Sequence, residues 1–171
     1  MEARTLTSSL IVTALIAMAP TGCGDDSTEP AEELPPADGA QLWSYLTEEN
    51  YDATWSLWPG RGERYAGTEP HGMLLTTYVN ELALHALEAG ATVLPAGAMV
   101  VKENYTPDGA LVAITTMYKV SGFDPAHDDW FWLKNDPAGV IEAEGKVESC
   151  TGCHAGAADF DFLWTLKNDR R

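Results

Sequence analysis

The sequence has little positive charge, few cysteines and no long apolar run. Only 10 Lys and Arg oppose 26 Asp and Glu in 171 residues, a formal net charge of −16. Such a chain repels phosphate backbones and anionic lipid headgroups, which argues against nucleic-acid binding and against electrostatic docking on membranes. A disordered acidic chain is excluded as well, because 45% of the residues are hydrophobic and six are tryptophan. The length fits one domain.

The amino-terminal apolar stretch is too short to cross a bilayer. It has about ten residues and ends at Ala19, whereas a spanning helix needs about 20. A basic start followed by such a stretch predicts a signal peptide over residues 1–22. The next residues resemble a bacterial lipobox, so we expect Cys23 to be lipidated and to hold an exported, periplasmic protein on a membrane. Ordinary signal cleavage is the alternative.

The segment after Cys23 differs in composition from the rest of the chain. Residues 23–37 are rich in Pro, Asp and Glu and contain one large aliphatic side chain. They cannot bury enough apolar surface to order themselves and predict a flexible tether. We therefore expect the folded domain over residues 38–171.

Hydrophobic periodicity within this domain predicts an α+β fold with a mainly antiparallel sheet and a few flanking helices. A capping Asp38 starts a short helix to Leu46. Predicted strands cover 98–104, 111–120, 130–133 and 140–141. Short turns such as Pro107-Asp-Gly109 join strands of this kind into antiparallel hairpins. Residues 73–87 fit either one helix or a strand followed by a helix.

The two remaining cysteines form the sequence Cys150-Thr-Gly-Cys153-His154. This spacing is typical of c-type haem attachment, since two thiols three positions apart reach the two vinyl groups of one haem. His154 is then the expected iron ligand. The alternatives are a redox disulfide or half of a zinc site, and a zinc site lacks a close pair of further ligands. We expect one covalently attached haem c.

The sixth coordination position of the iron has no obvious ligand. After His154 there is no Met, His or Lys until Lys167, so the downstream methionine of electron-transfer cytochromes c is absent. Upstream candidates are Met73, Met99, Met117 and the histidines at 71, 85 and 127. We expect these to be core or surface residues, which leaves an open iron site for a small ligand.

An ordered set of short motifs resembles the cytochrome P-460 family, which includes the cytochromes c′-beta. The matching residues are Trp58-Pro59, His71-Gly72, Tyr78-Val79-Asn80, residues 95–97, Val101-Lys102-Glu103, Lys119 with Gly122, Asp129-Trp130, the haem motif and Asp161-Phe162. The resemblance implies a mainly antiparallel sheet, a homodimer, and a strand followed by a helix over residues 73–87.

The same resemblance implies roles for individual residues. Lys102 occupies the position of the lysine that is joined to the porphyrin edge in hydroxylamine-oxidising members, a bond absent from the cytochromes c′-beta. Leu75 stands where a characterised member has a basic residue in the distal pocket, which predicts a more apolar pocket here. His71 and Asp129 are candidates for a proton acceptor there.

Two functional hypotheses follow. The first is a periplasmic mono-haem cytochrome that oxidises hydroxylamine or handles nitric oxide and passes electrons to a redox partner. The second is a non-catalytic gas-binding or electron-transfer protein like a cytochrome c′-beta. A haem-free domain with a Cys150–Cys153 disulfide is a third, weaker alternative. The acidic charge suggests a small neutral ligand and a partner with a basic docking face.

Overall fold

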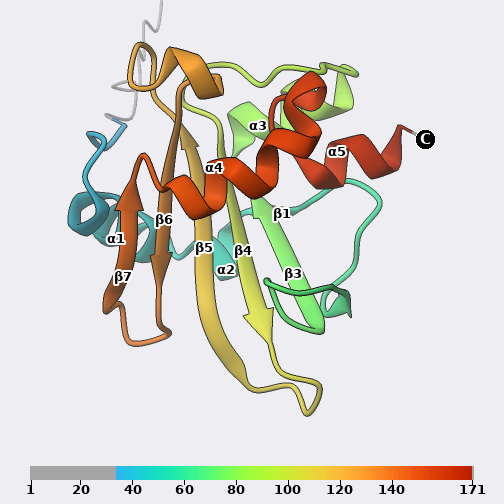
Figure 1. The fold of residues 1–171 in the computed structure, drawn as a ribbon. Helices are drawn as coiled ribbons and strands as arrows, with labels where there is room; N and C mark the ends of the chain where they lie inside the picture. The colour runs from blue at the N-terminus through green and yellow to red at the C-terminus, as the bar shows by residue number, and fades with distance from the viewer. Residues whose placement is uncertain (1–33, 171) are drawn as a thin grey trace, which may run out of the picture. The chain divides into compact units, whose positions relative to one another are not determined.

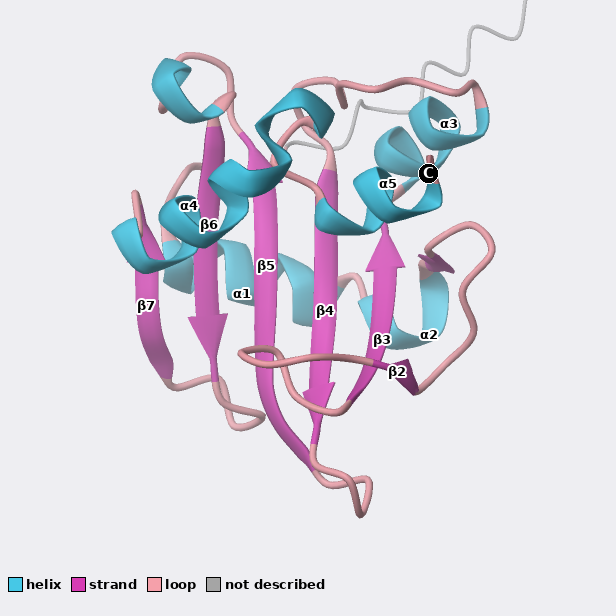
Figure 2. Cartoon of the chain, turned by 45° about the vertical axis from the view of Figure 1, so that its right-hand side comes forward, coloured by secondary structure: helices cyan, strands magenta, loops and turns pink. Residues whose placement is uncertain are grey.

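The computed structural model describes residues 34–170 as a sheet with helices on both faces (Figures 1 and 2). The helices are α1 (Gly39–Glu48), α2 (Tyr51–Thr54), α3 (Glu81–Glu88), α4 (Glu148–His154) and α5 (Trp164–Asp169). The strands are β1 (Ser56–Leu57), β2 (Tyr65–Ala66), β3 (Leu74–Val79), β4 (Met99–Tyr105), β5 (Leu111–Lys119), β6 (Trp130–Asn135) and β7 (Ile141–Gly145). Short 3-10 helices cover Pro125–His127 and Ala155–Phe160. The predicted α+β class is confirmed.

All seven strands form one antiparallel sheet in the order β1-β3-β4-β5-β6-β7, with β2 paired to β3. Gly109 supports the sharp turn between β4 and β5, because its φ of +87° is readily accessible only to glycine. Strands joined by such short turns lie side by side, so the four predicted strands are neighbours in the sheet.

The segment with two possible interpretations folds as a strand followed by a helix. β3 ends at Val79, and the side chain of Asn80 accepts a hydrogen bond from the backbone N–H of Ala83, which caps α3. Asp38 caps α1 in the same way through the N–H of Gln41. The predicted helix start at Asp38 is therefore confirmed, together with its physical cause.

Each face of the sheet has its own core. One cluster includes Leu42 and Leu46 of α1 packed against Val101, Ile114 and Phe131. On the opposite face, helices α4 and α5 cross the strands, and the loop between β2 and β3 crosses the same face nearer its other end (Figure 2). The cluster there includes Val100, Met117, Trp130, Trp132, Phe162 and Leu166. This second face carries the candidate site.

The predicted signal peptide, Cys23 and most of the tether lie outside the described residues. The described chain begins at Leu34, and Pro35 already belongs to the folded part, since its carbonyl accepts a hydrogen bond from Tyr118. The folded part thus begins a few residues before the expected Asp38. None of the helices within residues 34–170 is long and apolar enough to span a membrane.

Candidate functional site: a haem cavity on one face of the sheet

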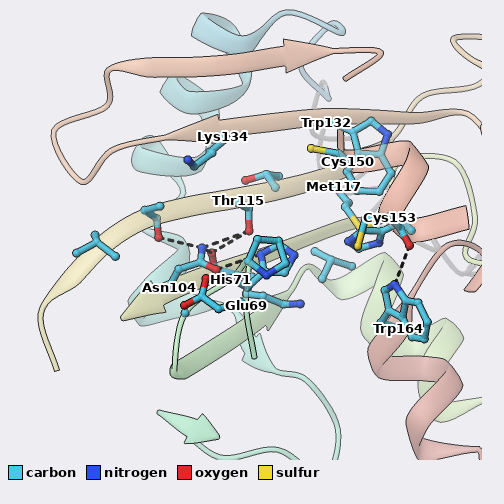
Figure 3. Close-up of a pocket in the computed structure, with 18 of the residues that line it drawn as sticks. Glu69, His71, Asn104, Thr115, Met117, Trp132, Lys134, Cys150, Cys153 and Trp164 are labelled. Carbon is cyan, nitrogen blue, oxygen red and sulfur yellow. Dashed lines mark hydrogen bonds between the residues drawn. The ribbon is translucent and has the colours of Figure 1, made fainter. Parts of the chain in front are cut away.

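A cavity of about 620 Å³ lies between the sheet, helix α4 and the loop that precedes β3 (Figure 3). This volume is in the usual range for small-molecule and cofactor pockets. The lining includes Cys150, Cys153 and His154 from the haem motif, Lys102 from β4 and His71 from the loop. The fold therefore brings the cofactor residues expected from the sequence to one place.

The sheet wall of the cavity is built from two rows of cross-strand neighbours. In the first row Val100, Met117 and Trp132 are adjacent on β4, β5 and β6. In the second row Lys102, Thr115 and Lys134 are adjacent on the same strands. Because side chains two positions apart on a strand share a face, both rows point to the cavity. One row is apolar and the other carries two cations.

Helix α4 presents the haem motif to this wall. Cys150 and Cys153 are three positions apart and so lie on the same side of the helix. Both thiols are free, and both line the cavity. Trp164 of α5 donates a hydrogen bond to the carbonyl of Cys153 at 3.2 Å, which ties α5 to the end of α4 (Figure 3).

His154 is buried, with 6% of its surface exposed, and is held by two neighbours. Its Nδ1 lies 2.6 Å from the carbonyl oxygen of Phe162. A carbonyl only accepts, so Nδ1 carries the proton and Nε2 keeps its lone pair. The Trp132 ring packs edge-on at 4.8 Å between centroids. Burial lowers the pKa of His154 to about 4, which keeps the imidazole neutral as a metal ligand requires.

The carbonyl that orients His154 belongs to a turn anchored in the core. Asp161 and Phe162 both have positive φ, at +56° and +60°. The Asp161 carboxylate accepts hydrogen bonds from Lys119 and from the N–H of Leu94, and its carbonyl accepts one from Trp130. Such second-layer contacts fix the direction and the tautomer of a metal-binding histidine. The sequence marked this turn only as a family motif, without a role.

Lys102 is half-buried and faces the cavity from the middle of β4. Burial lowers the pKa of its amine to about 8, and Arg61 adds to this effect. A lysine in this state has a larger neutral fraction near pH 7 than a solvent-exposed lysine, and only the neutral amine is a nucleophile. The position agrees with the expected place beside a haem, and the cross-link itself stays a prediction.

His71 lines the cavity from the loop before β3. Its Nδ1 is 3.2 Å from the side-chain oxygen of Asn104, and its ring is 5.9 Å from that of His154 between centroids. Burial lowers the pKa of His71 to about 4, with Lys102 and His154 contributing. It is therefore neutral at pH 7.

The two other predicted distal residues have different positions. Leu75 is buried and lines an adjoining cavity of about 410 Å³ together with His71, Lys102 and His154. Asp129 lines neither cavity, because its carboxylate accepts hydrogen bonds from the backbone of Gly122 and Asp124 in a surface turn. The structure thus corrects the expectation that Asp129 provides a proton acceptor in the pocket.

The wall residues missed from the sequence include Asn104, Thr115, Trp132 and Lys134. Thr115 and Met117 are two positions apart on β5 and so share a face, and β5 is the central strand of this wall. This pattern identifies a wall residue only once the strand register is known, because the register sets Thr115 opposite both Lys102 and Lys134. Register between strands is not encoded in one strand's pattern.

The residues fit a haem c. Trp132 Nε1 is buried on the cavity side of the sheet without a protein partner, which is the environment of an N–H that meets a bound group. Within residues 34–170 there is no group of three or more His, Cys, Asp or Glu side chains that could hold a metal ion.

Comparison with known proteins agrees with this geometry. A family model described as cytochrome P460 matches residues 54–165, about two thirds of the chain. No curated protein matched the chain. The matched range contains all seven strands, helix α4 and the haem motif, and it identifies the protein as a haem-binding cytochrome. The chain belongs to the cytochrome P460 family.

Proposed function

We propose that this cytochrome carries a single haem c bound through Cys150 and Cys153, oxidises hydroxylamine and binds nitric oxide, and passes electrons to a redox partner. The observation that carries the proposal is the state of His154. It is buried beside both free thiols, its Nδ1 donates to Phe162, and its Nε2 is left available to the cavity. This is the arrangement of a haem-iron ligand.

The side chains around the cavity have separate tasks in this proposal. The two thiols of α4 would hold the cofactor through thioether bonds to its vinyl groups. The Phe162 carbonyl orients His154, and the hydrogen bond it accepts raises the basicity of that ligand. When bound, the haem supplies an iron that coordinates small nitrogen compounds and accepts their electrons.

Lys102 is the residue that distinguishes the oxidase from a simple binding protein. Its amine reaches the cavity from the same row as Thr115 and Lys134, and its lowered pKa provides the neutral nitrogen that a covalent bond to the haem would require. We include this cross-link in the proposal. The second candidate is a gas-binding protein without the bond, which the apolar side chains of Leu75, Val100 and Met117 around the cavities favour.

Location and partner complete the proposal. Residues 1–22 as a signal peptide and Cys23 as a lipidated cysteine would hold the haem domain on the periplasmic side of a bacterial membrane through the anchor alone. A net charge of −16 favours a redox partner with a basic docking face and a ligand that needs no charge steering.

The test combines the mass of the haem peptides, the absorption spectrum of the protein and its rate of hydroxylamine turnover. The full chain is produced in a host that attaches haem c, and its haem peptides are sequenced by mass spectrometry. A peptide joined to Lys102 as well as to both cysteines, with a red-shifted Soret band and hydroxylamine turnover, supports the oxidase. Lys102→Arg should lose the third bond and the turnover, whereas Lys134→Arg, on the same row, should keep both.

Other results select among the alternatives. A normal Soret band without a Lys102 adduct and without turnover leaves the gas-binding protein. A chain that carries no covalent haem refutes both functions and returns the disulfide hypothesis for Cys150 and Cys153.

A further inference from the structure

One buried carboxylate lies behind the cavity wall, on the opposite face of the sheet. Glu103 follows Lys102 in β4 and therefore points away from the cavity, and 6% of its surface is exposed. The hydroxyl of Tyr51 donates to its Oε1 at 3.2 Å, and the hydroxyl of Tyr105 donates to its Oε2 at 2.6 Å. Each carboxylate oxygen thus serves one phenol, and haem attachment requires none of these three side chains.

Tyr105 connects this carboxylate with the cavity. It is the last residue of β4, where the pairing with β5 shifts register after Asn104. Tyr105 lines the cavity and is buried, while its hydroxyl reaches Glu103. The phenol therefore adjoins the space that the proposed haem would fill, and it has a proton acceptor within hydrogen-bond distance.

Oxidation of Tyr105 has to release its proton together with an electron. The guanidinium carbon of Arg64 lies 4.8 Å from the centre of the Tyr105 ring, and a cation in this place is attracted to an electron-rich ring and repelled by a positively charged one. Burial and the hydrogen bond to Glu103 raise the pKa of Tyr105 to about 12, so the hydroxyl holds its proton until the ring is oxidised. Loss of an electron makes a phenol strongly acidic, and Glu103 is placed to take the proton.

Tyr51 continues the network toward the surface. It belongs to α2, which lies on the face of the sheet opposite α4 and α5 (Figure 2). Its ring packs edge-on against Trp55 at 6.2 Å and against Tyr78 at 5.4 Å between centroids. Tyr51 is buried, whereas Trp55 is partly exposed. The series from the edge of the cavity to the surface of the opposite face therefore consists of Tyr105, Glu103, Tyr51 and Trp55.

We propose that the two phenols hydrogen-bonded to Glu103 form a radical-transfer route from the haem cavity to Trp55. The route supplies one electron to the haem when the haem reacts with hydrogen peroxide, and it leaves the oxidising equivalent at the surface. A histidine-ligated haem with an open position reacts with peroxides, as in peroxidases. The inference rests on the proposed covalent haem and goes beyond the proposed reaction, because neither hydroxylamine nor the redox partner takes part.

Protons and electrons balance along this route. Reduction of hydrogen peroxide to water takes a pair of electrons and a pair of protons: solvent gives the protons, the haem gives one electron, and Tyr105 gives the other through the haem. The Tyr105 proton moves to Oε2 of Glu103. Tyr51 then gives an electron to Tyr105 and its proton to Oε1, while Oε2 returns a proton to Tyr105. Trp55 finally gives an electron to Tyr51, which regains its proton from Oε1, and the oxidised indole releases its N–H proton to solvent. Glu103 ends as the carboxylate it was at the start.

The first test is electron paramagnetic resonance of holoprotein that is mixed with hydrogen peroxide and rapidly frozen. In Trp55→Phe, which lacks the last donor, a tyrosyl radical should accumulate, and its spectrum should narrow when the tyrosines carry ring deuterium. Adding Tyr105→Phe or Glu103→Gln should abolish this signal, since the first removes the phenol and the second removes the base. Adding Tyr118→Phe is the matched control and should keep the signal, because Tyr118 is buried in the same core but donates to the Pro35 carbonyl, which takes up no proton.

A second measurement locates the end of the route in the wild type. After treatment with hydrogen peroxide, mass spectrometry should find added oxygen on Trp55, and Tyr51→Phe should lose it because the route is cut one step before the indole. Trp43 is also partly exposed and reports direct oxidation from solvent, so its oxygen content should be the same in both proteins. Covalent haem and the circular dichroism spectrum are checked first in every variant.

The outcomes separate this inference from the proposed function. A tyrosyl signal that survives Tyr105→Phe, or equal oxidation of Trp55 in the wild type and in Tyr51→Phe, overturns the inference and leaves hydroxylamine oxidation standing if turnover is retained. The expected signals in a holoprotein without hydroxylamine turnover support the route and refute the oxidase. Absence of covalent haem refutes both.

Discussion

The buried ion pair between Asp161 and Lys119 gives the strongest stability prediction. Asp161 is 1% exposed and Lys119 is 7% exposed, and the same carboxylate accepts the N–H of Leu94 at 2.7 Å. Burial raises the pKa of the Asp161 carboxyl, and Lys119 acts against this shift. Asp161→Ala leaves the ammonium of Lys119 buried without its counter-ion. Removing one partner of a buried ion pair lowers the free energy of unfolding by about 3–5 kcal/mol, so we expect a decrease of that size for Asp161→Ala.

Urea unfolding of the wild-type and Asp161→Ala holoproteins measures this decrease in the free energy of unfolding. Equal slopes of the two transitions would show that both proteins unfold in the same way. Glu142→Ala is the control, because Glu142 forms a half-exposed ion pair with Lys134 at 2.6 Å and should cost under about 1 kcal/mol. The double variant Lys119→Met/Asp161→Leu should lose less stability than Asp161→Ala, because it leaves no unpaired buried charge. Equal losses for Asp161→Ala and Glu142→Ala would refute the reasoning.

Three further predictions concern attachment, packing and pH. Cys150→Ser and Cys153→Ser should each keep one thioether, visible as a shifted pyridine haemochrome band. The double variant should hold haem through Lys102 alone, and adding Lys102→Arg to it should release haem on denaturation. Trp132→Ala should lower the free energy of unfolding by about 3–5 kcal/mol. Trp132→Phe should lower it clearly less, because the lost N–H has no protein partner. Urea unfolding midpoints would show the difference. Burial and the neighbouring Glu103 raise the pKa of Tyr51 above its ordinary 10.0. Above pH 10 the tyrosine loses its proton in the unfolded chain before it does so in the folded protein, so the free energy of unfolding should fall by about 1.4 kcal/mol per pH unit. Tyr51→Phe should remove this contribution to the pH dependence of stability.

Local patterns in the sequence were sufficient for the elements that carry their own signals. The strand 98–104, the turn at Gly109 and the strand 111–120 became β4, the hairpin turn and β5 within one or two residues. Asp38 and Asn80 start helices through side-chain caps that depend on neighbours three residues away. The spacing of the haem motif likewise needs no long-range information.

The composition of the cavity wall could not be predicted in the same way. Lys134 and Asn104 reach the site only because β6 and β4 pair with β5 in a particular register. Asp129 shows the opposite failure, since an acidic residue that matched a family motif is used to close a turn. The role of Asp161 was hidden because its partners, Leu94 and Lys119, are far away in the sequence.

The cavity has one wall that is fixed and one that can vary. The fixed wall is the centre of a hydrogen-bonded sheet, where a change at Thr115 would disturb strands on both sides. The other wall is the loop 67–73, which contacts the sheet mainly at its base and at Asn104. Substitutions in this loop can therefore alter which ligands reach the iron while the cysteines, His154 and Lys102 keep their places. A protein built in this way can change its chemistry through a few loop residues, without having to evolve a new cofactor site.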